Sequence, residues 1–482
     1  MVNSPEKNIR QTPLVDAVLQ ARQRGLRPMQ IPGHKYRYVA DGEQAFGGEL
    51  LNSLVRDDVA LQGGADDNAY SGGHLIAAEK LYADAIGAEH TRFLVGGSSQ
   101  GNIAAFLAIG GDDVPVVVDR TSHRSALAGL ILSGSRPVWV MPSIHPEFGI
   151  PNGMDFQTVV HHADSAAAVF VTSPAYVGTL SNIAALAREC HARQIPLVID
   201  QAWGAHLDFG VRGVPSALRS GADLVITSIH KALLGYSQTA TISSRGNLID
   251  AQKLDRAVDL TATTSPSATL LASIDATRAV MEVDGLAELE RVTEIVGEAH
   301  RRLARIPGVV VLNLEPDLYL DPLKITLWLP RTGFTGTEIA QVLWESGVGV
   351  ETADSDTLVM SCVVGDTAEH IDFACRIIEH VLGGESRSPR PSMPAAVWRI
   401  EPDVVMTPRQ AAFAARERVE LALSVGRISA EQFCPYPPGV PIIGPGERIT
   451  QEIIDGIAVA AGVGRVAYSS DPTLRTIQVV CQ

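Results

Sequence analysis

Short apolar runs alternate with longer amphipathic segments between residues 91 and 242. The runs are apolar at nearly every position and not at every second one, which is typical of strands that are covered on both faces. Segments such as SNIAALARECHARQ, residues 181–194, have the spacing of amphipathic helices. The pattern predicts an α/β fold in which helices cover both faces of a mostly parallel sheet. The apolar runs are RFLV, VPVVVD, PVWVM, AAVFVT, IPLVID and ADLVIT.

The segments outside this region have other patterns. The chain begins with one helical pattern, PLVDAVLQARQRG, which leads into a glycine-rich stretch. Helical periodicity over residues 285–306 is followed by the apolar runs VVVLNL and KITLWLP, and the segment 383–394 is rich in Ser, Pro and Arg like a linker. We therefore expect an arm or lid at residues 1–80, a large domain at 81–284, a small α+β domain at 285–384 and a C-terminal α+β unit at 395–482.

The composition favours small-molecule chemistry in the cytoplasm. The 482 residues carry a net charge of -15 without a long basic block, which argues against a nucleic-acid partner. The five cysteines are scattered and form no CxxC pair, so neither a disulfide framework nor a zinc or other metal site is expected. No signal peptide and no membrane-spanning run is recognisable. We expect a soluble, cytoplasmic protein with no membrane partner.

Polar residues gather where the predicted strands end. Ligands of such sheets bind beyond the carboxyl ends of the strands, so these segments are the candidates for a site. They are GGSSQGN at residues 96–102, DRTSHRS at 119–125, TSPAYVG at 172–178, DQAWGAH at 200–206 and TSIHK at 227–231.

The first of these segments, GGSSQGN, is suited to a phosphate group. It follows a predicted strand and opens a predicted helix, so its backbone N–H groups and the hydroxyls of Ser98 and Ser99 could hold an anion. It is neither a Walker A loop nor a GxGxxG motif. A strand-to-helix turn made of small residues is the alternative interpretation.

Asp200 and Lys231 each follow an apolar run and are separated by about one strand-helix-strand unit. A lysine in a water-poor site has a lowered pKa and can form a covalent bond with an aldehyde. Pyridoxal phosphate (PLP) needs an anion cradle, a carboxylate for its pyridine nitrogen and an amine for its aldehyde. His123 is a candidate for a flat partner of the ring. Taken singly, each residue could also be a helix cap or a solvated side chain.

These motifs together resemble the fold-type I (aspartate aminotransferase-like), PLP-dependent Orn/Lys/Arg decarboxylases of bacteria, in their short form. The resemblance runs from residue 31 to residue 447, nearly the whole chain. The matching motifs are PGHK, GGSSQGN, DRTSHRSAL, TSPAYVGTLSNI, DQAWGAH, SIHKAL, SQTA, TTSPSATLLASIDATR and GRISAEQFCPYPPGVPIIGPGE. The last motif would not be expected in generic aminotransferases of the same fold.

The resemblance implies a role for each site residue. Lys231 is implied as the covalent anchor of the cofactor, Asp200 as the partner of the pyridine nitrogen and His123 as the stacking ring. As catalytic residues it implies Lys231, His230, His123 and Asp200. As cofactor-binding residues it implies Ser98, Ser99, Gln100, His123, Asp200, Ala202, Trp203, Ser228, His230 and Lys231. A homodimer or higher homo-oligomer is also implied, with its active site at the interface. TTSPS and the Gly-rich N-terminal region are the candidates for the cross-subunit contact.

Three segments depart from the family pattern. GGS stands where the family has NGT, DQAWGAH where the short forms have DEAHGAH, and residues 56–75 follow the family's substrate-side loop loosely. The reaction implied first is α-decarboxylation of arginine, lysine or ornithine, with arginine or lysine favoured. An oxidase, deaminase or aminotransferase acting on a basic amino acid, and a catalytically silent binding or regulatory subunit, are the alternatives. The candidate partners of a basic substrate side chain are Asp66, Asp67, Glu431 and Glu447.

Overall fold

The computed structural model describes most of the chain. It describes residues 11–24, 58–59, 73–384, 386–392, 399–436, 439–462 and 466–481. Asp66 and Asp67 lie outside the described residues. The predicted boundaries of the arm, the two domains and the C-terminal unit stay predictions.

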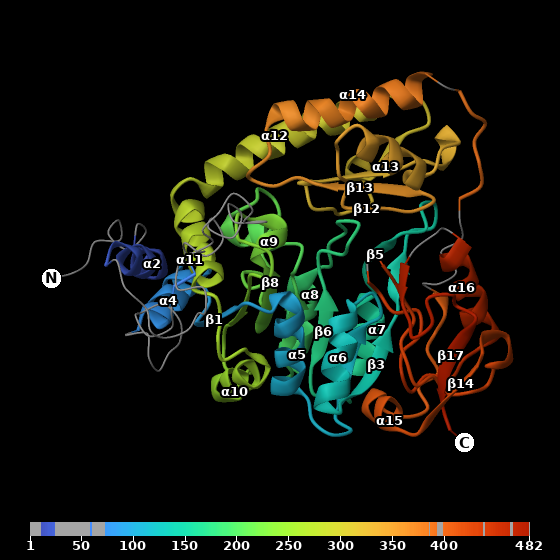
Figure 1. The fold of residues 1–482 in the computed structure, drawn as a ribbon, viewed down its shortest axis with the longest axis horizontal. Coiled ribbons are helices and arrows are strands. Elements are labelled where there is room, and N and C mark those ends of the chain that lie inside the picture. The colour runs from blue at the N-terminus through green and yellow to red at the C-terminus, as the bar shows by residue number, and fades with distance from the viewer. Residues whose placement is uncertain are drawn as a thin grey trace, which may run out of the picture.

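A seven-stranded sheet forms the centre of the molecule (Figure 1). Its order is β1-β9-β8-β7-β6-β2-β3, and the five strands from β8 to β3 are parallel to one another. β9 pairs antiparallel with both β8 and β1. Its direction relative to β8 follows from residues 229–239, which are too few for a crossover connection. The strands are β1 (His90–Leu94), β2 (Pro115–Asp119), β3 (Arg136–Val140), β6 (Val169–Thr172), β7 (Leu197–Asp200), β8 (Leu224–Ser228) and β9 (Ala240–Ser244).

Helices cover both faces of this sheet, as the apolar runs predict. Val116 and Val118 belong to one hydrophobic cluster, whereas Val117 between them belongs to another. The first face carries α5 (Gly97–Ile109), α6 (Arg124–Ser133) and α10 (Ala251–Thr261), which lie in front of the strands in Figure 1. The second face carries α2 (Pro13–Gln23), α4 (His74–Ile86), α7 (Phe156–Ala163), α8 (Ile183–Ala192) and α11 (Ala268–Val283).

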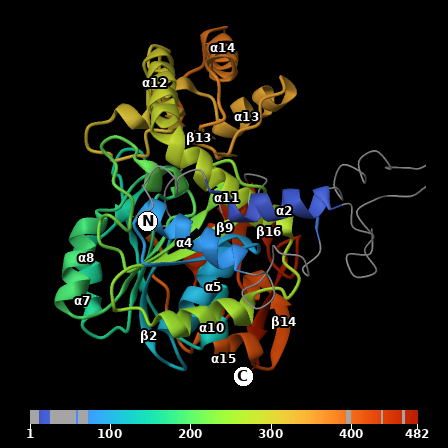
Figure 2. The same ribbon diagram turned by 90° about the vertical axis from the view of Figure 1, so that its left-hand side faces the viewer.

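A smaller four-stranded sheet lies above the large one in Figures 1 and 2. Its antiparallel strands are β10 (Val310–Val311), β11 (Lys324–Trp328), β13 (Thr357–Ser361) and β12 (Thr352–Ala353), in this order, covered by α12 (Gly285–Leu303), α13 (Gly336–Glu345) and α14 (Ala368–Gly384). The predicted strand VVVLNL is shorter than expected, because residues 312–314 form a 3-10 turn, η2 (Leu312–Leu314). The side-chain amide of Asn313 makes hydrogen bonds there that a strand backbone would otherwise make. Its oxygen accepts from the N–H of Thr326, and its nitrogen donates to the carbonyl of Asp321.

The C-terminal segment packs against the side of the large sheet near α6 and β3 (Figure 1). Phe433, Ile443, Ile453 and Val479 belong to its own hydrophobic core. Its elements are α15 (Pro408–Phe413), β14 (Arg416–Glu420), β15 (Cys434–Tyr436), α16 (Gln451–Gly462), β16 (Val466–Tyr468) and β17 (Thr476–Val480). Shorter elements of the chain are the hairpin β4 (Pro142–Ile144) and β5 (Pro151–Met154), α9 (Ile229–Ala232), η1 (Ala205–Phe209), η3 (Pro330–Thr332) and η5 (Leu421–Leu423).

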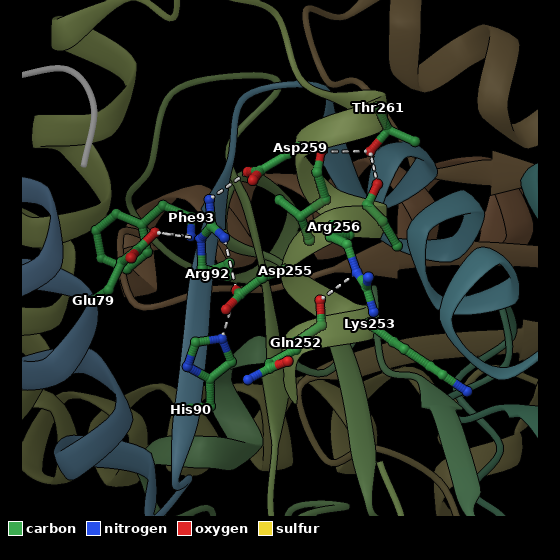
Figure 3. A network of polar contacts seen from close by, with 12 residues as sticks. Glu79, His90, Arg92, Phe93, Gln252, Lys253, Asp255, Arg256, Asp259 and Thr261 are labelled. Carbon is green, nitrogen blue, oxygen red and sulfur yellow. Dashed lines mark hydrogen bonds and ion pairs between the residues drawn. The ribbon is translucent and has the colours of Figure 1, made fainter. Parts of the chain in front are cut away.

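The edge strand β1 is tied to helices on both faces through Arg92, as Figure 3 shows. The Arg92 guanidinium lies 2.7 Å from Asp255 and 3.1 Å from Asp259 of α10, and 3.4 Å from Glu79 of α4. Glu79 also accepts a hydrogen bond from the N–H of Phe93. Burial raises the pKa of Glu79 to about 7, against the positive charge of Arg92. No helix in the described part of the chain is both long and apolar enough to cross a bilayer.

Candidate active site

A cavity of about 560 Å³ opens at the carboxyl ends of the central strands. Its walls come from the loops that follow β1, β2, β6, β7 and β8, which is the edge where the sequence places its polar segments. The residues of the sequence analysis that line it are Ser98, Ser99, His123, Asp200, Ala202, Trp203, His230 and Lys231. The structure therefore brings eight of the ten expected cofactor-binding residues to one cavity.

Lys231 lies three residues beyond β8, on the single helical turn α9. Its Nζ is 3.9 Å from the centroid of the Trp203 ring. Burial lowers the pKa of Lys231, and the negative charges of Asp200 and Glu351 oppose this shift. The site thus holds an amine that is easier to deprotonate than a lysine in water.

Asp200 is the last residue of β7, and neutral groups hold its carboxylate. The Nδ2 of Asn102 donates to Oδ2 of Asp200 at 2.7 Å, and the N–H of Ala202 donates to Oδ1 at 3.1 Å. Burial raises the pKa of Asp200, while the Asn102 hydrogen bond, the charge of Lys231 and the Ala202 hydrogen bond oppose this shift. Asp200 is therefore a buried carboxylate whose contacts include hydrogen-bond donors but no cation among the described residues.

Asn102 also connects Asp200 to His123. Its Nδ2 donates to the Oγ of Ser125 at 2.9 Å, and that Oγ lies 2.8 Å from Nδ1 of His123. His123 is the N-cap of α6, where Nδ1 accepts the N–H of Ser125. Nδ1 is then the unprotonated nitrogen, so the Ser125 hydroxyl donates to it. The Ser125 oxygen can therefore accept from Asn102 while its hydrogen is donated to His123.

The imidazole of His123 is neutral at physiological pH. Burial, followed by the positive charges of Lys231 and Arg124, lowers the pKa of His123 to about 4. An uncharged ring on the cavity wall presents a flat aromatic face, which is what the stacking role expected for His123 requires.

The GGSSQGN segment forms the start of α5, as predicted. Gly97, with φ of 69°, is the first helical residue, and no described side chain caps this helix. The N–H of Gly97 donates to the carbonyl of Gln238 at 2.8 Å, and Oε1 of Gln100 accepts the N–H of Gly96 at 3.0 Å. Gln100 thus supports the loop and does not line the cavity, whereas Ser98 and Ser99 face it at a helix N-terminus, where an anion is stabilised.

Ser228 and His230 precede Lys231 in the sequence. Nδ1 of His230 lies 2.9 Å from the carbonyl of Thr239, so this nitrogen carries the proton and Nε2 is the acceptor. Burial lowers the pKa of His230, against the Thr239 hydrogen bond. Ser228 does not line the cavity, but its Oγ is buried without a hydrogen-bond partner among the described residues.

Several lining residues were missed in the sequence. Thr121, Thr172 and Tyr176 lie in the quoted strand-end segments, so a signal for them existed. Glu351 comes from the loop before β12 of the small sheet and belongs to no quoted motif. The remaining members of the lining are Gly96, Gly97, Gln238, Thr352 and Val440.

Two of the four carboxylates expected to bind a substrate side chain, Glu447 and Glu431, have other partners in the described part of the chain. Glu447 pairs with Arg120 at 2.6 Å. Glu431 accepts hydrogen bonds from the backbone of Ser470 and Gln478 in the C-terminal segment. Neither lines the cavity, so Glu351 is the carboxylate of the small sheet that does.

The donor set of the cavity fits PLP. None of the described cations forms a hydrogen bond with Asp200, and a protonated pyridine nitrogen would supply such a partner. Lys231 provides an amine with a lowered pKa, and Ser98 and Ser99 provide donors at a helix N-terminus. The unpartnered hydroxyl of Ser228 is one further donor for an acceptor group.

Family models match most of the chain. Residues 12–314 match the model described as Orn/Lys/Arg decarboxylase, major domain, and residues 392–464 match the model described as Orn/Lys/Arg decarboxylase, C-terminal domain. The chain belongs to the Orn/Lys/Arg decarboxylase family. The resemblance inferred from the sequence motifs is thereby confirmed.

Relatives of this Orn/Lys/Arg decarboxylase family member align along almost its whole length. An arginine decarboxylase of Halalkalibacterium halodurans is 30% identical over 482 residues, with 98% of each chain covered. An arginine decarboxylase of Bacillus subtilis is 29% identical over 483 residues, again with 98% of each chain covered. The lysine decarboxylase LdcA of Pseudomonas aeruginosa is 25% identical over 572 residues, covering 93% of this chain and 75% of its own.

Solved structures share the fold of this family member. The lysine decarboxylase LdcF of Francisella novicida gives a TM-score of 0.80 at 19% identity, covering 98% of this chain and 82% of its own. Serine palmitoyltransferase of Sphingomonas wittichii gives 0.54 at 13% identity, covering 78% of this chain and 86% of its own. The family and these neighbours are PLP-dependent fold-type I enzymes, which confirms the expected fold class.

Proposed function

We propose that the protein is a PLP-dependent enzyme that removes the α-carboxylate of a basic amino acid as carbon dioxide and releases the corresponding amine. The observation that carries this proposal is that Lys231, Asp200, His123 and the Ser98–Ser99 turn line one cavity. The full-length alignment with proteins named arginine decarboxylase supports the same reaction.

The cavity residues would hold the cofactor in the following way. Lys231 would bond the aldehyde carbon, Asp200 would pair with the pyridine nitrogen, and His123 would stack on the ring. Ser98 and Ser99 would bind the phosphate at the start of α5. When bound, PLP supplies an electron-accepting ring that stabilises the electron pair left on the α-carbon when carbon dioxide departs.

Residues around the cavity set the protonation states that the reaction requires. Asn102 donates to Asp200 and so favours its ionised form, which is needed to keep a pyridine nitrogen protonated. Whenever its amine is not bonded to the cofactor, Lys231 would be a free amine in the cavity that can carry a proton. His230 has its proton on Nδ1, which donates to Thr239, so its Nε2 could accept a proton, whereas protonated Lys231 could return one to the α-carbon.

Glu351 is our candidate for the partner of the substrate's distal cation. It lines the cavity, and its charge acts on both Lys231 and the buried Lys324 of β11. A carboxylate can bind a guanidinium with two parallel hydrogen bonds but an ammonium only as a point charge. Together with the names of the full-length relatives, this favours arginine, then lysine, then ornithine.

We also infer a homodimer or higher homo-oligomer in the cytoplasm. The TTSPS segment, residues 263–267, follows α10, where Leu260 is 79% exposed, and this surface is the candidate for the second subunit. The five scattered cysteines, which form no CxxC pair, are typical of a protein of a reducing compartment.

A substrate panel tests the proposal. Purified protein with PLP is incubated with arginine, lysine and ornithine while carbon dioxide, oxygen and products are followed. We expect carbon dioxide and the amine of the preferred substrate, without oxygen uptake. Lys231→Ala should abolish turnover, and the matched variant Lys253→Ala, on the surface of α10, should not. Oxygen uptake without carbon dioxide would indicate an oxidase instead, and a wild type without a visible cofactor band would indicate a silent homologue.

A further inference from the structure

Arg120 and Glu447 form a buried ion pair between the large sheet and the C-terminal segment. Nη1 of Arg120 lies 2.6 Å from Oε1 of Glu447, and Nη2 lies 2.9 Å from Oε2. Nη2 also donates to the carbonyl of Ile442 at 2.7 Å, and the N–H of Gly444 donates to Glu447 at 3.0 Å. The guanidinium lies 4.8 Å from the centroid of the Trp139 ring. Such a two-pronged pair fixes the position and the orientation of both side chains.

The pair is continuous with the wall of the cavity. Arg120 is the residue directly after β2, and Thr121 and His123, next in the chain, line the cavity. On the other side, the carbonyl of Gly439 accepts the N–H of Arg124 at 2.9 Å, and Val440 also lines the cavity. The C-terminal segment therefore contacts the loop of residues 119–125 on both sides of His123.

Neighbouring strands also hold the start of this loop. The N–H of Arg120 donates to the carbonyl of Val140 at 2.9 Å, and Thr172 donates to Asp119 and Ser122 at 3.3 Å each. The N–H and the hydroxyl of Thr121 donate to Oδ1 of Asp119 at 2.8 and 2.7 Å, which are bonds within the loop itself. At its end, His123 contacts Ser125, which Asn102 connects to Asp200. A displacement of Arg120 would therefore be transmitted to His123 and to the hydrogen-bond chain that supports Asp200.

We propose that Glu447 and Arg120 are positioning residues through which the C-terminal segment holds the loop of residues 119–125, and with it His123, against the cofactor site. This gives the C-terminal segment a function in a reaction whose proposed cofactor-binding side chains all belong to the large sheet and its loops. This inference rests on the proposed function, because it takes PLP to be the ring on which His123 stacks.

The test compares two double variants with the wild type, with and without added PLP. Arg120→Leu/Glu447→Leu removes both charges, so no unpaired ion stays buried. Arg427→Leu/Glu417→Leu removes a 2.5 Å ion pair elsewhere in the C-terminal segment and is the matched control. Should the first variant aggregate, Arg120→Lys decides by the same readouts, because lysine keeps the charge but cannot bind both carboxylate oxygens as a fork.

Three readouts separate positioning from a general loss of stability. In the Arg120/Glu447 variant, amide hydrogen exchange of residues 121–126 should accelerate at least about tenfold, while residues 224–232 exchange as in the wild type. The visible circular dichroism per bound cofactor should fall at least about twofold, because a stacked ring imposes the asymmetry. The kcat should fall about tenfold with KM changed less than about threefold.

The proposal would be overturned if the Arg120/Glu447 variant matched the control variant in hydrogen exchange and in circular dichroism. It would also be overturned if exchange in residues 224–232 accelerated as much as in residues 121–126. A wild type that takes up no PLP would instead contradict the proposed function. The exchange arm, which needs no cofactor, would then still decide whether the Arg120–Glu447 pair holds the loop.

Discussion

Asp200 and Glu447 are equally buried carboxylates near the carboxyl edge of the same sheet, each 2% exposed, and their partners differ. Glu447 has the guanidinium of Arg120 on both oxygens. Asp200 has the amide of Asn102 and a backbone N–H, and the positive charge of Lys231 acts on it through space. We infer that a buried carboxylate in a complete ion pair has a structural role. A buried carboxylate that is held by neutral donors beside a cavity is a candidate binding site for a cationic ligand.

Removing the charge of Asp200 should have the largest effect on activity. Asp200→Asn is expected to lower kcat/KM on the order of 10³-fold, because the ring nitrogen loses the carboxylate that keeps it protonated. The cofactor-free protein should unfold at the same or a higher temperature, since a buried unpaired charge is removed. Asp208→Asn, in another buried carboxylate that lies off the cavity, is the control and should retain activity. Equal activity losses in both variants would contradict this assignment.

The opposite result is expected at Glu447. Glu447→Gln leaves the Arg120 guanidinium buried without its anion and should cost about 3 kcal/mol of unfolding free energy. Denaturant melts of the cofactor-free protein measure this loss, with Asp200→Asn melted in parallel. If Asp200→Asn proved the more destabilised of the two, the distinction between a structural and a ligand-binding carboxylate would fail.

Asn102 sharpens the comparison because it holds Asp200 in the ionised form. Asn102→Leu removes the donor to Asp200 and to Ser125, and we expect kcat to fall about 30-fold, near 2 kcal/mol of transition-state stabilisation. The optimum of kcat should also move to higher pH, because the pKa of Asp200 rises further when its donor is lost. Asn182→Ala, which removes the cap of α8, is a control of similar chemistry. An unchanged pH profile in Asn102→Leu would count against the role of Asn102.

Glu79 provides a third buried carboxylate, with a smaller expected effect. Burial raises the pKa of Glu79 to about 7, above the value near 4.5 of an exposed glutamate. The folded state therefore binds more protons than the unfolded state between these values, and stability falls as the pH rises. Relative to Glu79→Gln, the wild type should lose about 1 kcal/mol between pH 6 and pH 7, as measured by denaturant melts. An identical pH dependence in both proteins, with exposed Glu298→Gln as control, would contradict the buried, destabilised state of Glu79.

The sequence was most informative where structure and chemistry are local. The fully apolar runs predicted the strands from β1 to β8 that form the central sheet, because strands covered on both faces need apolar side chains at every position. Lys231, Asp200 and His123 could be selected because each lies at the end of such a run or in the short segment that follows it. The antiparallel pairing of β9 could not be seen, since it depends on the length of a connection and not on hydropathy.

What the sequence did not indicate are contacts between distant segments. Arg120 and Glu447 are 327 positions apart, and each alone is an ordinary charged residue after a strand or in a loop. Glu351 reaches the cavity from the small sheet, and its place depends on how that sheet packs on the large one. Asn102 lies in a quoted motif, but its two hydrogen bonds depend on how α5 packs beside β7 and α6, which the motif does not reveal.

The central claim is that Lys231 anchors PLP in this cavity, and peptide mapping after borohydride reduction tests it most directly. Reduction fixes the cofactor on its lysine, and a modified lysine is not cut by trypsin. We predict that the cofactor mass appears on the uncut peptide from Ser220 to Arg245, which contains Lys231 as its single lysine. A cofactor mass on another lysine, such as the buried Lys324, or no adduct at all in PLP-saturated protein, would contradict the account.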